Sequence, residues 1–191
     1  MQQQLEMENR IQLSTEEIIM GFVASCIEDV ADALGLDYLE VYQRMNAVKM
    51  IDEYIIPSYE VLHSESRKNV TEGLIDTLKR WEGSEIAVIE ICDDHRTMSE
   101  DQHRKVRNII RWQRIGCIVV KISETLNVSL KEALDLFYGS ETCRRFHDEE
   151  TGLYLQGNLY VLNDFLAEIS RWDQKSFGTN LEPKRKNRPL R

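Results

Sequence analysis

The sequence predicts an all-α protein made of two homologous small helical modules that pack together. Apolar residues recur at helical spacing through most of the chain, and this pattern repeats at an offset of 92 residues, as from Val23 to Ile115. Glycine (9 residues) and proline (3 residues) are scarce. Because a module of about 70 residues has only a marginal core of its own, two such modules would be stabilised by burying a shared face.

The predicted organisation has four parts: a first module at 10–82, a linker at 83–100, a second module at 101–173 and a basic tail at 174–191. The tail is rich in lysine and arginine with almost no apolar residues, so we expect it to be disordered in isolation. The linker contains the one β-branched run, 86–92, which forms either a short strand or an extension of the preceding helix. A lone strand would need to pack against the modules or pair with another chain.

Each module is predicted to open with a long helix. Apolar residues at i, i+3, i+4, i+7 and i+11 define it, and they are Val23, Cys26, Ile27, Val30 and Leu34 in the first module and Ile115, Ile118, Val119, Ile122 and Leu126 in the second. Gly35 and Asn127 should end these helices because both residues tolerate the left-handed conformation. Asp37 and Ser129, each followed three residues later by a glutamate, should cap the next helix.

The rest of each module is predicted to hold a second helix, a short third segment and a last helix that ends at a tryptophan. The predicted ranges are 38–46, 49–55 and 67–81 in the first module, and 130–138, 140–146 and 158–172 in the second.

The first helix of the second module changes its apolar side near Gly116. At about 100° per residue, Val106, Ile109 and Ile110 lie nearly opposite the face used by Ile115 and its successors. Either the helix bends there, or its N-terminal half packs on something other than its own module. The linker, the first module and a partner protein are the candidates.

The same helix carries a positive stripe formed by Arg104, Arg107, Arg111 and Arg114. The formal net charge of the chain is −9, which disfavours a general nucleic-acid surface. The stripe therefore either pairs with acidic runs of the chain, such as Glu149 with Glu150, or docks an acidic protein.

No catalytic, metal or cofactor site is predicted. The sequence contains no phosphate-binding glycine loop, nucleophile elbow or zinc-protease motif. Cys143 and His147 stand at i, i+4, where a thiol and a base could meet, although such spacing is more often coincidence. Four residues could supply zinc ligands but match no strong zinc spacing: Cys92, Asp94, His95 and His103.

Composition also predicts the compartment. The four cysteines are widely spaced, the N-terminus is polar and acidic, and no apolar run approaches the roughly 20 residues that span a bilayer. We therefore expect a cytoplasmic protein that makes no membrane contact.

Two stretches of the chain resemble a bacterial family of small helical proteins. In the first module the matching words are Phe22-Val23-x-x-Cys26-Ile27-Glu28, Ile51-Asp52-x-Tyr54-Ile55 and Tyr59-x-x-Leu62-His63. In the second they are Leu130-x-Glu132-Ala133-Leu134-Asp135-Leu136-Phe137-Tyr138-x-Ser140 and Glu149-x-Thr151-Gly152-Leu153-Tyr154. The resemblance covers about residues 18–81 and 107–170, as two variants of the family fused in one chain.

Members of this family are typically encoded beside a protein that looks like an ADP-ribosyltransferase. The resemblance therefore implies a non-enzymatic antitoxin that binds its cognate toxin and covers the active site, without a cofactor. The alternative is a DNA-binding autoregulator of the same operon, whose arginine stripe and tail would contact operator phosphates.

The residues expected to bind a partner are aromatic or apolar anchors near the turns, together with the arginine stripe. The anchors are Tyr59, Leu62, Phe137, Tyr138 and Tyr154, and His63 is expected to bind the partner with them. Filling the module core is the competing interpretation, and it is stronger for Leu62 and Phe137 than for Tyr138 and Tyr154. For His63, a capping role at a loop–helix junction competes.

Overall fold

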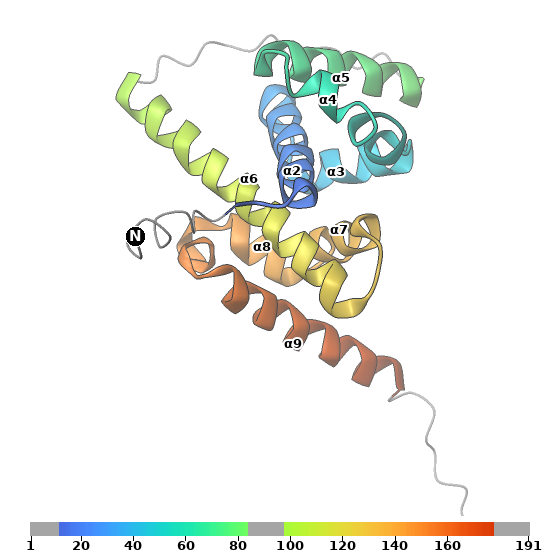
Figure 1. Ribbon diagram of the computed structural model, residues 1–191, viewed down its shortest axis with the longest axis vertical. Coiled ribbons are helices and arrows are strands. Elements are labelled where there is room, and N and C mark those ends of the chain that lie inside the picture. Colours follow the sequence, from blue (N-terminus) through green and yellow to red (C-terminus); the bar gives the residue numbers. More distant parts are fainter. Residues whose placement is uncertain (1–11, 84–97, 178–191) are drawn as a thin grey trace, which may run out of the picture. The chain divides into compact units, whose positions relative to one another are not determined.

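The computed structural model describes residues 12–83 and 98–177, with side chains described for 12–83 and 106–172. Every regular element in these ranges is a helix, which confirms the predicted all-α class (Figure 1). The predicted linker run at 86–92 lies outside the described residues, as does the tail from residue 178. Residues 174–177 are helical, so the last helix is longer than predicted.

The chain forms two compact units, which divide between Gly139 and Ser140. This boundary falls inside the predicted second module, 101–173. The boundary between the compact units therefore differs from the boundary between the predicted modules. The division into two homologous modules stays a prediction.

The first unit contains six α-helices and one π-helical turn among the described residues. In chain order they are α2 (Thr15–Leu34), α3 (Tyr38–Ala47), the π-helical η1 (Ile51–Ile55), α4 (Tyr59–Leu62), α5 (Arg67–Glu82), α6 (Met98–Leu126) and α7 (Leu130–Tyr138).

The ends of these helices follow local sequence signals. Gly35 and Asn127 are left-handed, with φ of 63° and 52°, which confirms both predicted helix ends. Ser129 forms a capping box with Glu132, as predicted. Asp37 also caps its helix as predicted, although its carboxylate accepts from the backbone N–H of Leu39 at 2.8 Å.

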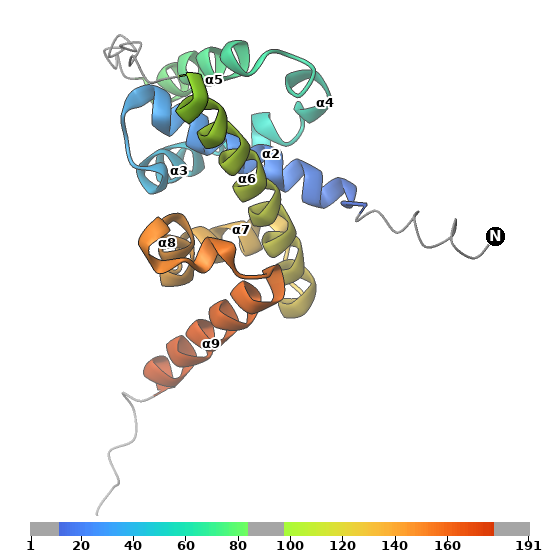
Figure 2. The ribbon, with the colours of Figure 1, turned by 90° about the vertical axis from the view of Figure 1, so that its left-hand side faces the viewer.

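The core of the first unit lies where α2 packs against α6, and Figures 1 and 2 both show these helices crossing. Two glycines allow the close approach. A Cβ atom at Gly116 would lie 2.7 Å from the backbone nitrogen of Gly21 and closer still to the carbonyl oxygen of Glu17. The fully buried side chains here include Val23, Ile27, Ile115 and Ile118.

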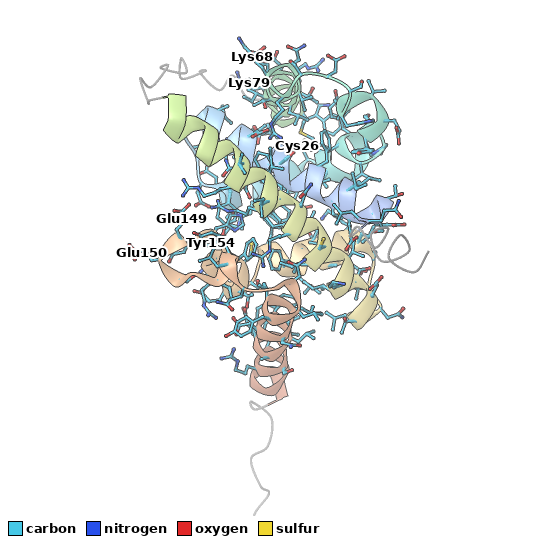
Figure 3. All side chains as sticks on the ribbon, turned by 60° about the vertical axis from the view of Figure 1, so that its left-hand side comes forward. Cys26, Lys68, Lys79, Glu149, Glu150 and Tyr154 are labelled. Atoms are coloured by element: carbon cyan, nitrogen blue, oxygen red, sulfur yellow. The ribbon has the colours of Figure 1, made fainter. Side chains whose placement is uncertain are left out.

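Four polar side chains connect α2, α5 and α6. The Trp112 indole donates a hydrogen bond to the buried Glu28 carboxylate at 2.8 Å. Arg67, the first residue of α5, forms an ion pair with Asp29 of α2 and lies over the Trp112 ring. Figure 3 shows Cys26 among these helices, whereas Lys68 and Lys79 project from α5.

The second unit contains α8 (Glu141–His147), two 3-10 turns, η2 (Glu149–Thr151) and η3 (Leu153–Leu155), and α9 (Asn158–Phe177). Glu168 of α9 caps the start of α8, because its carboxylate accepts from the backbone N–H groups of Glu141 at 2.8 Å and Thr142 at 2.9 Å. Phe146 and Phe165 are fully buried in this unit.

Candidate protein-binding surface

An exposed apolar stripe runs along the N-terminal half of α6. Val106, Ile109 and Ile110 are 57%, 47% and 52% exposed, whereas Ile115 on the opposite side is fully buried. The helix is continuous through Gly116, so the predicted change of apolar face occurs along one helix. Exposing three β-branched apolar side chains in a row to water is unfavourable, which is why such stripes commonly mark contact surfaces.

The predicted arginine stripe is not uniformly exposed. Arg107 is exposed, whereas Arg111 and Arg114 are half-buried, and the side chain of Arg104 lies outside the described residues. Burial lowers the pKa of Arg114. Of the three described arginines, Arg107 is therefore the one that borders the apolar stripe at the surface.

Three of the predicted anchors come together on α4. The Tyr59 ring stacks on His63, with centroids 4.6 Å apart and planes 11° apart, and meets the edge of Phe22 from α2 at 5.3 Å. His63 Nδ1 lies 2.7 Å from the carbonyl oxygen of Tyr59, so it donates to that oxygen. His63 is exposed at the C-cap of α4, whereas Tyr59 and Leu62 are half-buried.

Sequence reasoning missed two residues of this surface. Phe22 joins it only through tertiary contact with Tyr59. Val61, at 66% exposed, is the most exposed large apolar residue described in the first unit. A helix of four residues is too short to show a helical period, so no sequence signal indicated which way Val61 would face.

The prediction that Tyr138 is a partner-binding anchor is wrong, because the structure buries this side chain completely. Its ring stacks on Tyr42 of α3, with centroids 4.5 Å apart, and meets the edge of Tyr38 at 6.1 Å. Tyr138 therefore fills the interior beside α3 and is not an exposed anchor. Phe137 is also fully buried, as the core interpretation predicted.

Tyr154 lies half-buried in η3 of the second unit. Figure 3 shows Glu149 and Glu150 projecting outward from the turn just before it. Leu155, Leu159 and Tyr160 follow it in sequence, and all three are exposed. The exposure of these three residues was also missed, because Leu159 and Tyr160 belong to a helix whose period alone does not fix its buried side.

The cysteines that the structure describes are buried. Cys143 Sγ lies 3.6 Å from His147 Nδ1, but that nitrogen also lies 2.9 Å from the Cys143 carbonyl oxygen, and the thiol is fully enclosed. Burial raises the pKa of the Cys26 thiol to about 12 and that of the Cys117 thiol to about 11, so both are poor nucleophiles.

The described side chains contain no group of three histidine, cysteine or acidic residues that could hold a metal ion. Of the four residues considered as zinc ligands, Cys92, Asp94 and His95 lie outside the described residues, as does the side chain of His103. Within the ranges 12–83 and 98–177, no helix has the length and apolar character needed to cross a bilayer.

Comparison with known proteins gives one family match. Residues 21–81 are similar to a family described as a protein of unknown function (DUF3791). The match covers about a third of the chain, from the α2–α6 crossing to the end of α5, and includes α4. Neither the curated proteins nor the solved structures contain a match to this chain.

Proposed function

We propose that the protein is a non-enzymatic binding protein that neutralises a cognate ADP-ribosyltransferase-like toxin by covering its active site. The observation that carries the proposal is the exposed stripe of Val106, Ile109 and Ile110 on a helix whose opposite side is buried. The partner's identity rests on the family resemblance of the sequence, not on the stripe.

The stripe can supply binding free energy without chemistry. Full burial of an aliphatic side chain is worth about 1.5–3 kcal/mol, so burying the remaining half of three such side chains contributes roughly 3 kcal/mol. The exposed Arg107 gives the stripe a cationic border. A toxin bound at the stripe would be inhibited because the bound protein sterically covers its active site.

We also propose that the chain arose by duplication of a helical module. Two pairs of helix-end residues support this, because Gly35 and Asn127 are both left-handed, Asp37 and Ser129 are both N-caps, and each pair is 92 positions apart. The helices that correspond under this offset also touch: α2 packs on α6, and Tyr42 of α3 stacks on Tyr138 of α7.

Operator binding is the less favoured alternative. Phosphate contacts need exposed cationic side chains, and Arg107 is the one exposed arginine among the described residues of the stripe. A gel shift on upstream DNA at two salt concentrations would test it, since phosphate contacts weaken steeply with salt.

The proposed function is tested by co-expression with the ADP-ribosyltransferase-like product of the adjacent gene. We expect the two proteins to co-purify, toxicity to disappear, and Ile109→Asp to abolish both effects. Leu159→Asp, an equivalent change at an exposed leucine of the second unit, is the matched control. Failure of the two wild-type proteins to associate would overturn the proposal.

A further inference from the structure

The helices that correspond under the 92-residue offset pack against each other close to their own counterparts. Gly21 of α2 corresponds to Gln113 of α6, and a Cβ atom at Gly21 would lie 3.5 Å from the Cα atom of Gln113. The hydroxyl of Tyr42 in α3 donates a hydrogen bond to Asp135 of α7, one position from its counterpart Leu134. In a symmetric pair, residues that meet their own counterparts lie close to the two-fold axis.

The order of the contacts gives the direction of this axis. In both helix pairs, later residues of one helix contact earlier residues of the other. The contacts that show this are Gly21 with Gly116 and Glu28 with Trp112 between α2 and α6, and Tyr38 with Tyr138 and Asn46 with Asp135 between α3 and α7. A two-fold axis that runs across the helices produces this order. The α2–α3 helices therefore pack on α6–α7 as two identical subunits pack in a symmetric dimer.

One buried polar contact breaks this symmetry. The Trp112 indole donates to the Glu28 carboxylate at 2.8 Å, and both side chains are buried. The symmetry-related positions hold Met20 and Val120, which are also buried but apolar. Pairing α2 with the α2 of another chain would place Glu28 opposite Met20 and remove the indole donor. Burying a carboxylate without its donor is unfavourable, whereas placing a methionine against a valine is not.

We propose that α2 with α3 forms a surface that fits the same surface of a second copy of this chain, and that Glu28 and Trp112 direct it instead to α6 and α7 of its own chain. The carboxylate and the indole satisfy each other in the pairing of unlike helices. They are separated when α2 pairs with α2 or α6 pairs with α6. A single buried polar group selects the partner of a helix in the same way in coiled coils.

This inference rests on the duplication proposed above and deepens it, because it states how the duplicated helices avoid pairing between chains. A duplicated module inherits the self-complementary surface of its ancestor, so each chain could associate with others through either copy. Different residues at equivalent positions favour the pairing within one chain and disfavour the others.

The test moves the indole from one copy to the other without changing the composition of the full-length chain. The variant is Met20→Trp with Trp112→Met. In it, two α2 helices from different chains would satisfy both Glu28 carboxylates, whereas α2 and α6 of one chain would not. We expect size-exclusion chromatography with light scattering to give double the mass of the wild type, with a dimer fraction that rises with concentration.

The matched control adds Glu28→Val and Val120→Glu to the two-residue variant. This second exchange again places a carboxylate opposite the indole within one chain, so the mass and the melting temperature should return to those of the wild type. A folded two-residue variant with the mass of the wild type would overturn the inference, as would a dimer that persists in the four-residue variant.

The four-residue variant also decides the case in which the two-residue variant does not fold. Both side-chain pairs can exchange places only at equivalent positions, so recovered folding supports the inference and an unfolded protein overturns it. Toxin binding is measured on the wild type and through Ile109→Asp, and none of these four positions belongs to the α6 stripe. The proposed toxin binding and this inference can therefore fail separately.

Discussion

The Arg67 guanidinium lies 4.1 Å from the centre of the Trp112 ring and also pairs with Asp29. One side chain at the start of α5 thus contacts both α2 and α6. We expect Arg67→Ala to lower the free energy of unfolding by about 1 kcal/mol, most of it from the cation–π contact, since the ion pair is half-exposed. Arg67→Lys should recover only part of the lost stability, because an ammonium group does not stack on the ring as a flat guanidinium does. Urea denaturation would measure both, and an alanine variant as stable as the wild type would contradict the prediction.

Gly116 should not tolerate any side chain. A Cβ atom there would collide with the backbone of α2 at Gly21, so Gly116→Ala should destabilise the protein by about 3 kcal/mol or prevent folding. Gly73, in α5, provides the control, because a Cβ atom at that position would have no neighbouring atom within 4 Å. Gly73→Ala should stabilise by about 0.5–1 kcal/mol, because alanine is the better helix former. Equal melting temperatures for the two variants would contradict the close approach of α2 and α6 at Gly116.

Asp29 should make stability depend on pH. Burial raises the pKa of its carboxyl from 3.8 to about 6, against the opposing effect of Arg67. The folded state then binds the proton more tightly than the unfolded chain. Relative to Asp29→Asn, the wild type should therefore lose about 1 kcal/mol as pH rises from 4 through 6, with little further change above 7. Urea denaturation of both proteins at pH 4.5 and 7.5 would measure the difference, and a constant difference would contradict it.

Lys49 is a site of backbone strain. It joins α3 to η1 with a φ of 57°, which an ordinary side chain adopts at a cost of about 1–2 kcal/mol. Lys49→Gly should therefore raise the free energy of unfolding by about 0.5–1 kcal/mol after the greater chain entropy of glycine is counted. Lys49→Ala retains the strain and should leave stability nearly unchanged, so a gain in the alanine variant would point to charge instead. Urea denaturation of the two variants would measure both effects.

The features predictable from sequence were those fixed by neighbouring residues. Gly35 and Asn127 end helices because of their own backbone freedom, and Ser129 caps through Glu132 three residues away. The exposed side of α6 was also predictable in part, because its two apolar stripes differ in helical phase.

Features that depend on contacts between distant segments could not be predicted. Tyr138 is buried because α3 brings Tyr42 against it, 96 positions earlier in the chain. Phe22 reaches Tyr59 in the same way. The π-helical form of η1 had no signal either, since Ile51 and Ile55 fit an α-helical spacing equally well.

The capping of α8 by Glu168 ties two distant stretches of chain into one folding event. The carboxylate that satisfies the first amides of α8 lies 27 positions beyond Glu141. Ser140 caps the amide of Cys143 locally, so during synthesis the amides of Glu141 and Thr142 are the ones that gain their partner only after Glu168 has left the ribosome. A premature stop just ahead of residue 168 would remove the second half of α9 and also leave the first two amides of α8 without their partner, so a truncation in one helix would weaken the start of the other.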